Sequence, residues 1–243
     1  MAHICQSISL SSRNIRSIFG GSLIAYCTWF FLLVSTVAQA QRESELNMVS
    51  FMESKPGLEA GIAYFQTLYA FRNGDKIESV GAGRVSREVI YSMMADSLTM
   101  YLQDIDSSML TSQWIIQLTE RQYKIAERRV TASFVLVNGT ENETRLPKST
   151  FDKVILEHGL HEFTQQNKMM TDIRATLKPD GQLFVWELMA KKPGRKHRFC
   201  KKPMLTEQQL IEMMDRAGFR LTKSVRVFRD VPKGKLYTFL LAE

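Results

Sequence analysis

The chain has 243 residues, enough for one large domain or two small ones, and its 44% hydrophobic content is ordinary for a globular protein. The formal net charge is +7 at pH 7. Apart from one cluster, the basic residues are spread through the chain, which argues against a protein that binds nucleic acid over its whole surface.

The N-terminal segment has the features of a secretory signal peptide. Two arginines, Arg13 and Arg16, precede an uncharged stretch over 17–41, and an Ala-Gln-Ala sequence that ends at Ala40 is typical of a signal peptidase site. We therefore predict a signal peptide over 1–40, cleavage near Ala40 and export to the periplasm or the extracellular space. The alternative is an uncleaved membrane anchor formed by residues 17–41.

Cysteine usage is consistent with export without requiring it. Cys5 and Cys27 lie in the predicted signal peptide, which leaves Cys200 alone in the mature chain. A single cysteine cannot form an internal disulfide, and no local sequence around it marks a catalytic thiol.

Beyond the predicted signal peptide, the chain alternates between patterns typical of helices and patterns typical of strands. A polar lead-in over 41–57 comes first. The predicted helices span 58–71, 86–95, 109–129, 165–177 and 206–218, and the predicted strands span 77–80, 98–102, 132–137, 151–156, 183–188, 221–228 and 236–241. A turn is predicted at Pro179-Asp180-Gly181.

This alternation predicts a single α/β domain over 58–243. Strands joined by helices usually pair in parallel, so we expect a Rossmann-like, doubly wound, mostly parallel seven-stranded sheet. The last two predicted strands are separated by a short loop that contains Pro232 and Gly234. That spacing favours a C-terminal antiparallel hairpin.

A glycine-containing turn joins the first predicted strand to the second predicted helix. Gly81-Ala82-Gly83 follows the strand directly, and Asp104 comes 23 positions after Gly81, at the end of the next strand. Residues without a bulky side chain let the backbone approach a ligand closely. An acid at the tip of the neighbouring strand can accept hydrogen bonds from ribose hydroxyls, so the stretch indicates a nucleoside site.

These residues resemble motif I and the acidic motif of class I S-adenosylmethionine-dependent methyltransferases. Three further segments, 104–110, 146–154 and 177–183, resemble that family in the same order along the chain. The sequence departs from the family at two positions, because Val85 replaces the third glycine and Thr140 replaces the acid after the third strand. The resemblance implies S-adenosylmethionine as cofactor, with binding by Gly81, Ala82, Gly83, Asp104, Ile105, Thr140 and Glu141.

Two histidines follow the fourth predicted strand, in the sequence Glu-His-Gly-Leu-His-Glu over 157–162. In the family this loop borders the transferred methyl group, so the resemblance implies that His158 or His161 orients the acceptor or takes its proton. The order of residues in the loop matches no standard metal motif, and no metal site is predicted.

The one basic cluster lies over 191–202, where seven Lys or Arg residues and His197 occur without an acid. Such a run is commonly a solvated loop. Related enzymes place substrate-covering insertions at this point, which makes an anionic group on the acceptor or an anionic membrane surface a candidate partner. The predicted partner is therefore a small-molecule or lipid-like acceptor, and nucleic acid is not expected.

The leading functional hypothesis is a methyltransferase acting on an unidentified acceptor. Export counts against it, since the methyl donor is made in the cytoplasm. An exported non-catalytic binding module on the same scaffold is therefore the second hypothesis. An NAD(P)-dependent oxidoreductase, which would use 81–86 as its fingerprint, is the third, but two glycines are too few for that motif.

Overall fold

The computed structural model describes residues 53–108, 110–227 and 234–242. The chain divides into two units, and the second, Phe51–Glu243, holds all of these residues. The predicted signal peptide and its alternative, a membrane anchor, lie outside the described residues and stay predictions. In the described parts of the chain, no helix is long and apolar enough to cross a membrane.

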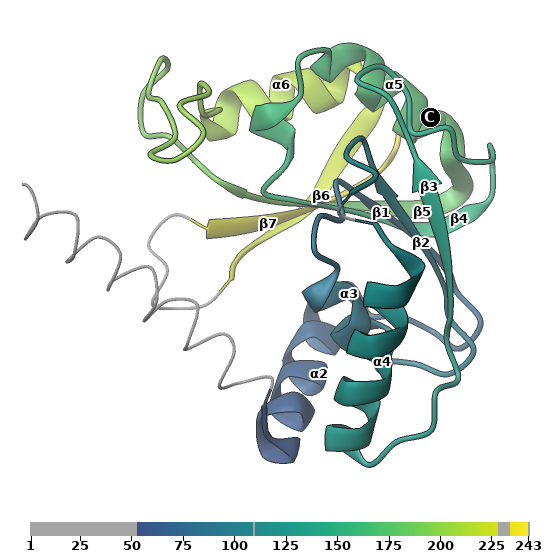
Figure 1. The fold of residues 1–243 in the computed structure, drawn as a ribbon. Helices are drawn as coiled ribbons and strands as arrows, with labels where there is room; N and C mark the ends of the chain where they lie inside the picture. Colours follow the sequence, from purple (N-terminus) through teal and green to yellow (C-terminus); the bar gives the residue numbers. More distant parts are fainter. Residues whose placement is uncertain (1–52, 109, 228–233, 243) are drawn as a thin grey trace, which may run out of the picture. The chain divides into compact units, whose positions relative to one another are not determined.

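A single seven-stranded sheet forms the centre of the domain (Figure 1). Its order is β3-β2-β1-β4-β5-β7-β6. The strands are β1 Lys76–Val80, β2 Thr99–Asp104, β3 Ser133–Asn138, β4 Phe151–Glu157, β5 Leu177–Leu188, β6 Phe219–Arg226 and β7 Gly234–Leu241. The first five pair in parallel, and β7 lies antiparallel between β5 and β6. The predicted fold class and the C-terminal hairpin are confirmed.

Helices cover both faces of the sheet (Figure 1). Helices α2 Lys55–Tyr69, α3 Ser86–Tyr91 and α4 Ser112–Ala126 lie on one face, and α5 Gln166–Thr176 and α6 Glu207–Arg216 on the other. A short 3-10 helix, η1 Leu160–Glu162, follows β4. Because both faces are covered, neighbouring residues of β4 are buried on opposite sides. Ile155 joins the core under α2, α3 and α4, whereas Val154 and Leu156 join the core under α5 and α6.

The first described helix begins earlier than predicted. Ser54 caps it by accepting a hydrogen bond from the backbone N–H of Gly57, and Pro56 occupies the first turn, where no backbone donor is needed. The helix predicted to start at Leu58 therefore starts three residues earlier, at Lys55. The predicted helix over 86–95 is also too long, since α3 ends at Tyr91.

The predicted turn at Pro179-Asp180-Gly181 is wrong as well, because β5 runs through it. Phe151 pairs with Leu177 and Lys153 pairs with Gln182, so β5 advances five residues while β4 advances two. The extra residues form a bulge. A Cβ atom on Gly181 would lie 2.9 Å from the carbonyl oxygen of Phe151, so this glycine permits close packing of two strands.

The parallel strands bring distant loops to one edge of the sheet. The carboxyl ends of β1, β2 and β4 lie side by side, with Val80 pairing with Gln103 and with Leu156. The glycine turn, the acid at the end of β2 and the histidine loop are consequently neighbours. Ligands bind at this edge in open α/β sheets.

Candidate active site

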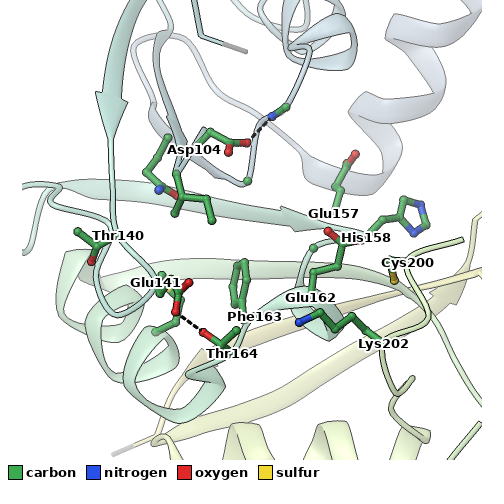
Figure 2. A pocket seen from close by; sticks show the side chains of 16 residues that line it. Asp104, Thr140, Glu141, Glu157, His158, Glu162, Phe163, Thr164, Cys200 and Lys202 are labelled. Atoms are coloured by element: carbon green, nitrogen blue, oxygen red, sulfur yellow. Dashed lines mark hydrogen bonds between the residues drawn. The ribbon is translucent and has the colours of Figure 1, made fainter. Parts of the chain in front are cut away.

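A cavity of about 370 Å³ lies at the carboxyl edge of the sheet (Figure 2). All of the predicted site residues line it except Ala82 and His161. The lining residues are Gly81, Gly83, Gln103, Asp104, Ile105, Thr140, Glu141, Glu157, His158, Gly159, Glu162, Phe163, Thr164, Met169, Cys200 and Lys202.

The glycine turn presents bare backbone to this cavity. The N–H groups of Gly81 and Ala82 donate to the carbonyl oxygen of Gln103 at 2.9 and 3.0 Å, which holds the turn against β2. Gly81 and Gly83 have φ angles of +69° and +54°, and a Cβ atom on either would meet no atom of the described residues within 4 Å. Open space beside a left-handed backbone suits the close approach of a ligand. Ala82 instead points its methyl group into the core.

Asp104 stands at the end of β2 beside the glycine turn. Its Oδ2 atom accepts a hydrogen bond from the Gly83 N–H at 2.9 Å, and its Oδ1 atom accepts one from the Asp106 N–H at 2.9 Å. A carboxylate has about four acceptor positions, so two remain for ligand hydroxyls. The next residue, Ile105, leaves 56% of its surface exposed and offers an apolar surface beside the acid.

The loop after β3 closes one end of the cavity. The hydroxyl oxygen of Thr140 accepts hydrogen bonds from the N–H groups of Asn142 and Glu143, both at 3.2 Å, so this side chain stabilises a tight turn. Glu141 accepts a hydrogen bond from the Thr164 hydroxyl at 2.8 Å (Figure 2). That bond links the loop after β3 to the segment after η1.

His158 leaves the sheet at the carboxyl end of β4. Its backbone N–H donates to the carbonyl oxygen of Trp186 at 2.8 Å, and the centroid of its imidazole ring lies 4.7 Å from that of the Trp186 indole. Burial, and then the nearby Arg87 guanidinium, lower the pKa of His158. The imidazole is therefore held neutral at physiological pH. Its backbone has a φ of +55°, a strained conformation of the kind that clusters at functional sites.

A buried polar network surrounds Glu157, which sequence reasoning did not select. Its Oε1 atom accepts hydrogen bonds from the Tyr69 and Tyr91 hydroxyls, and its Oε2 atom lies 2.9 Å from Nη1 of Arg87. Burial, followed by the charge of Glu157, raises the pKa of both tyrosines. Since Tyr69 belongs to α2 and Tyr91 to α3, the network ties two helices to the end of β4.

The structure separates the two predicted catalytic histidines. His158 lines the cavity, whereas His161 is buried and directs its Nδ1 atom at Oε2 of Glu187, 3.0 Å away. The hydrogen bond to that fully buried carboxylate is the main cause that raises the pKa of His161. The imidazole of His161 also lies 4.8 Å from that of His197, measured between ring centroids.

The cavity has two ends (Figure 2). Asp104, Thr140 and Glu141 mark one end, and Glu162, Cys200 and Lys202 mark the other. The lining includes four carboxylates, Asp104, Glu141, Glu157 and Glu162, against one fixed positive charge, that of Lys202. An acidic lining with a bare glycine turn fits a ligand that is positively charged and rich in hydroxyl groups, as the sulfonium nucleoside S-adenosylmethionine is.

Lys202 belongs to the basic cluster that the sequence predicts to meet an anionic group. Five lining residues that sequence reasoning did not select are Glu162, Phe163, Thr164, Met169 and Cys200. A signal existed for two of them. Glu162 ends the histidine loop and Phe163 directly follows it, at the edge of the sheet where ligands bind. No local pattern identified Cys200, because Glu162, which lies near it, is distant in sequence.

Residues 80–185 match the family model described as a methyltransferase domain. Similar solved structures include an S-adenosylmethionine-dependent methyltransferase from Aquifex aeolicus (14% identity, 73% of this chain and 87% of that chain covered, TM-score 0.53). Also similar is the Burkholderia thailandensis 1,6-didemethyltoxoflavin-N1-methyltransferase with bound 1,6-didemethyltoxoflavin and S-adenosylhomocysteine. Its identity is 17%, with 94% of this chain and 94% of that chain covered and a TM-score of 0.55. A third is the glycopeptide N-methyltransferase MtfA complexed with S-adenosylhomocysteine (14% identity, 75% of this chain and 86% of that chain covered, TM-score 0.54). No curated protein matches.

The described domain thus has the fold of the class I methyltransferases, and its central part, residues 80–185, matches the model of a methyltransferase domain. This confirms the resemblance seen in the sequence. The family match supports a methyltransferase, and the fold is shared with solved methyltransferases that bind S-adenosylhomocysteine. Neither identifies the acceptor.

Proposed function

We propose that this protein transfers the methyl group of S-adenosylmethionine to a small acceptor molecule that carries an anionic group. One observation carries the proposal: the glycine turn with Asp104 and the histidine loop with His158 line the same cavity. A donor site and an acceptor site must be continuous for direct transfer, because the reacting atoms have to approach within about 3–3.5 Å.

The donor would occupy the end of the cavity nearest β2. The exposed backbone of Gly81 and Gly83 suits the methionine part, and the free acceptor positions of Asp104 suit the ribose hydroxyls. Ile105 offers an apolar surface to the adenine ring. Thr140 and Glu141 border this end, and the Glu141 carboxylate is suited to an amino group.

The acceptor would occupy the end nearest Lys202. Lys202 is the one fixed positive charge among the described residues that line the cavity, so it would pair with a carboxylate or phosphate on the acceptor. His158, held neutral, can accept the proton that a hydroxyl or amine acceptor releases. Bound S-adenosylmethionine supplies an activated methyl group, so the protein contributes chiefly positioning.

The identity of the donor can be tested by calorimetric titration of the full chain. We expect S-adenosylmethionine and S-adenosylhomocysteine to bind and NAD to give no heat of binding. Binding of NAD alone would favour an oxidoreductase. If none of the three binds at millimolar concentration, the protein is a non-catalytic binding module, because a methyltransferase cannot act without its donor.

The acceptor class can be tested with a donor that carries an isotopic label in its methyl group. Pools of small carboxylates, pools of small phosphates and vesicles of anionic lipid would be offered separately, so that a lipid-like acceptor is distinguished from a soluble one. With the acceptor found, Lys202→Ala should raise KM at least about tenfold through loss of a charge-assisted hydrogen bond.

Lys201→Ala is the matched control for that variant. The Nζ atom of Lys201 donates to the carbonyl oxygen of Arg198 at 2.6 Å, and Lys201 does not line the cavity. An equal rise of KM in both variants would refute a specific contact by Lys202 and indicate a diffuse effect of the basic loop.

A further inference from the structure

Four side chains with the chemistry of zinc ligands lie together beside the cavity. One ligand atom from each of His161, Glu162, His197 and Cys200 lies within 4.8 Å of every other. The first two residues belong to η1, after β4, and the last two belong to the loop after β5. No sequence pattern predicts this site, because its two halves are separated by helix α5 and strand β5.

The Nε2 atom of His161 is a buried polar atom whose hydrogen-bonding capacity is unused. His161 is 5% exposed, and this buried nitrogen has no hydrogen-bond partner among the described residues. The nearest carboxylate oxygen, Oε1 of Glu162, lies 3.7 Å away, beyond hydrogen-bond distance. A buried polar atom without a partner costs free energy, and a metal ion at this position would remove that cost.

The other nitrogen of His161 is already fixed in the manner of a zinc-binding histidine. Nδ1 lies 3.0 Å from Oε2 of Glu187, a fully buried carboxylate. Metal-binding histidines commonly donate their second N–H to a carboxylate, which orients the ring and strengthens the ligand. Glu187 thus orients the ring through Nδ1 and leaves Nε2 of His161 available to bind a metal ion.

A small hairpin presents the two ligands of the basic loop. The N–H of Met204 donates to the carbonyl of Arg195 and the N–H of His197 donates to the carbonyl of Lys202, both at 2.8 Å. Within it, Nδ1 of His197 lies 3.2 Å from Sγ of Cys200. Zn–N bonds of about 2.0 Å and Zn–S bonds of about 2.3 Å place two tetrahedral ligands about 3.5 Å apart, so this pair needs almost no movement.

We propose that His161, His197 and Cys200 bind a zinc ion, with Glu162 as the fourth ligand. Two imidazoles, one thiolate and one carboxylate form a donor set that zinc accepts in tetrahedral sites. The largest separation, 4.8 Å, requires an inward shift of about 1 Å on binding. Three anionic groups would offset the positive charge of the ion beside a basic loop: the carboxylates of Glu162 and Glu187 and the thiolate of Cys200.

The ion would fasten the basic loop to the segment after β4. Lys202, which lines the cavity, lies two residues after Cys200, so the metal would set the position of the side chain proposed to bind the acceptor. This goes beyond methyl transfer, because zinc here organises the wall of the acceptor site and performs no step of the reaction.

Zinc and cobalt titrations of the full chain test the proposal without any methyl donor, so their result is independent of the proposed activity. We expect one zinc ion per chain after removal of adventitious metal, measured by mass spectrometry. With Co²⁺ in place of zinc, a thiolate-to-cobalt charge-transfer band should appear. Cys200→Ser should abolish that band, and His197→Ala should weaken zinc binding by more than the roughly 10–100-fold expected for an outer-shell change such as Glu187→Gln.

Two controls match these variants. The double variant Cys5→Ser, Cys27→Ser should keep the cobalt band, and His158→Ala, which alters the other histidine of the same segment, should keep the zinc affinity. The proposal is overturned if the wild-type chain retains no zinc and gives no cobalt band. It is also overturned if the band survives Cys200→Ser or disappears in the Cys5, Cys27 variant.

Discussion

The carboxylate of Asp104 accepts a hydrogen bond from the backbone N–H of Gly83, with 2.9 Å between Oδ2 and N. The acid at the end of β2 therefore holds the glycine turn after β1 in place, in addition to presenting free acceptor positions to the cavity. The glycine turn and Asp104, which the sequence presents as separate parts of a cofactor site, are thus joined by a direct hydrogen bond.

Asp104→Ala should weaken binding of S-adenosylhomocysteine by at least about tenfold, since each charge-assisted hydrogen bond contributes about 1.5–3 kcal/mol. Calorimetric titration measures this directly. Asp106→Ala is the matched control, because Asp106 is a nearby exposed acid whose Oδ1 atom accepts hydrogen bonds from Ser108. If Asp106→Ala loses affinity and Asp104→Ala does not, Asp106 is the ribose ligand.

Val85 is expected to tolerate glycine better than alanine. It is 1% exposed and has a φ of +52°, a conformation that costs an L-residue about 1–2 kcal/mol and glycine nothing. Both variants lose buried surface, and the extra methyl of alanine is worth only about 0.8 kcal/mol. Val85→Gly should therefore have the higher free energy of unfolding, measured by chemical denaturation.

Val89, a buried position inside α3, provides the comparison for Val85. There Val89→Ala should be more stable than Val89→Gly by about 1 kcal/mol, the usual order inside a helix. The same order at both positions would show that the left-handed conformation of Val85 is not costly.

Glu78 makes stability depend on pH. Burial in β1 is the main cause that raises the pKa of Glu78 from 4.5 to about 8. The hydrogen bond from the Thr176 hydroxyl lowers this pKa, and the charges of Asp172 and Lys148 have smaller effects, the first raising it and the second lowering it. The folded state then binds one more proton than the unfolded state between about pH 4.5 and 8, so this residue lowers stability as pH rises through that window.

Glu78→Gln should remove that dependence. The variant should be more stable than the wild type at pH 8 and close to it at pH 5, as measured by denaturant unfolding. Glu120→Gln, at an exposed position of α4, should shift stability by a similar small amount at both pH values. A difference between Glu78→Gln and wild type that does not change with pH would contradict the raised pKa.

Arg87 and Glu157 should be strongly coupled in a double-mutant cycle on unfolding free energy. Removing one partner of a buried ion pair costs about 3–5 kcal/mol, because the other charge is left uncompensated. The Glu157 side chain is 6% exposed and that of Arg87 is 26% exposed. Arg87→Met should therefore cost more than Glu157→Gln, and the double variant should cost less than the sum.

The surface pair Arg121–Glu53 calibrates that measurement. Its N···O distance of 3.1 Å resembles that of the buried pair, but the two side chains are 59% and 49% exposed. Its coupling energy should stay below about 1 kcal/mol. Equal coupling for both pairs would mean that burial does not strengthen the contact to Glu157.

The export prediction rests on residues outside the described structure. Chain purified from the native host should begin at Gln41 and be recovered outside the cytoplasm, as determined by N-terminal sequencing of fractionated cells. A chain that begins at Met1 and sediments with membranes would instead support the anchor formed by residues 17–41.

The sequence by itself determined the fold class and one end of the candidate site. Alternating strand and helix patterns are local, and so is the succession of strand, Gly81-Ala82-Gly83, helix, strand and Asp104. Because parallel strands deliver their carboxyl ends to one edge, these residues could be expected to meet without knowledge of any long-range contact. Helix ends were less certain, since Ser54 and Pro56 mark a start that apolar periodicity alone places at Leu58.

Only the tertiary structure decided what faces the glycine turn. The contacts of Tyr69 and Arg87 with Glu157, the bulge of β5 opposite Phe151, and the approach of Cys200 to His161 join residues that are distant in sequence. Which of them meet depends on strand order, pairing register and the path of the loops, and no local pattern encodes these. Burial and neighbouring groups then set the ionisation of each side chain: burial lowers the pKa of His158, whereas the hydrogen bond to Glu187 raises the pKa of His161.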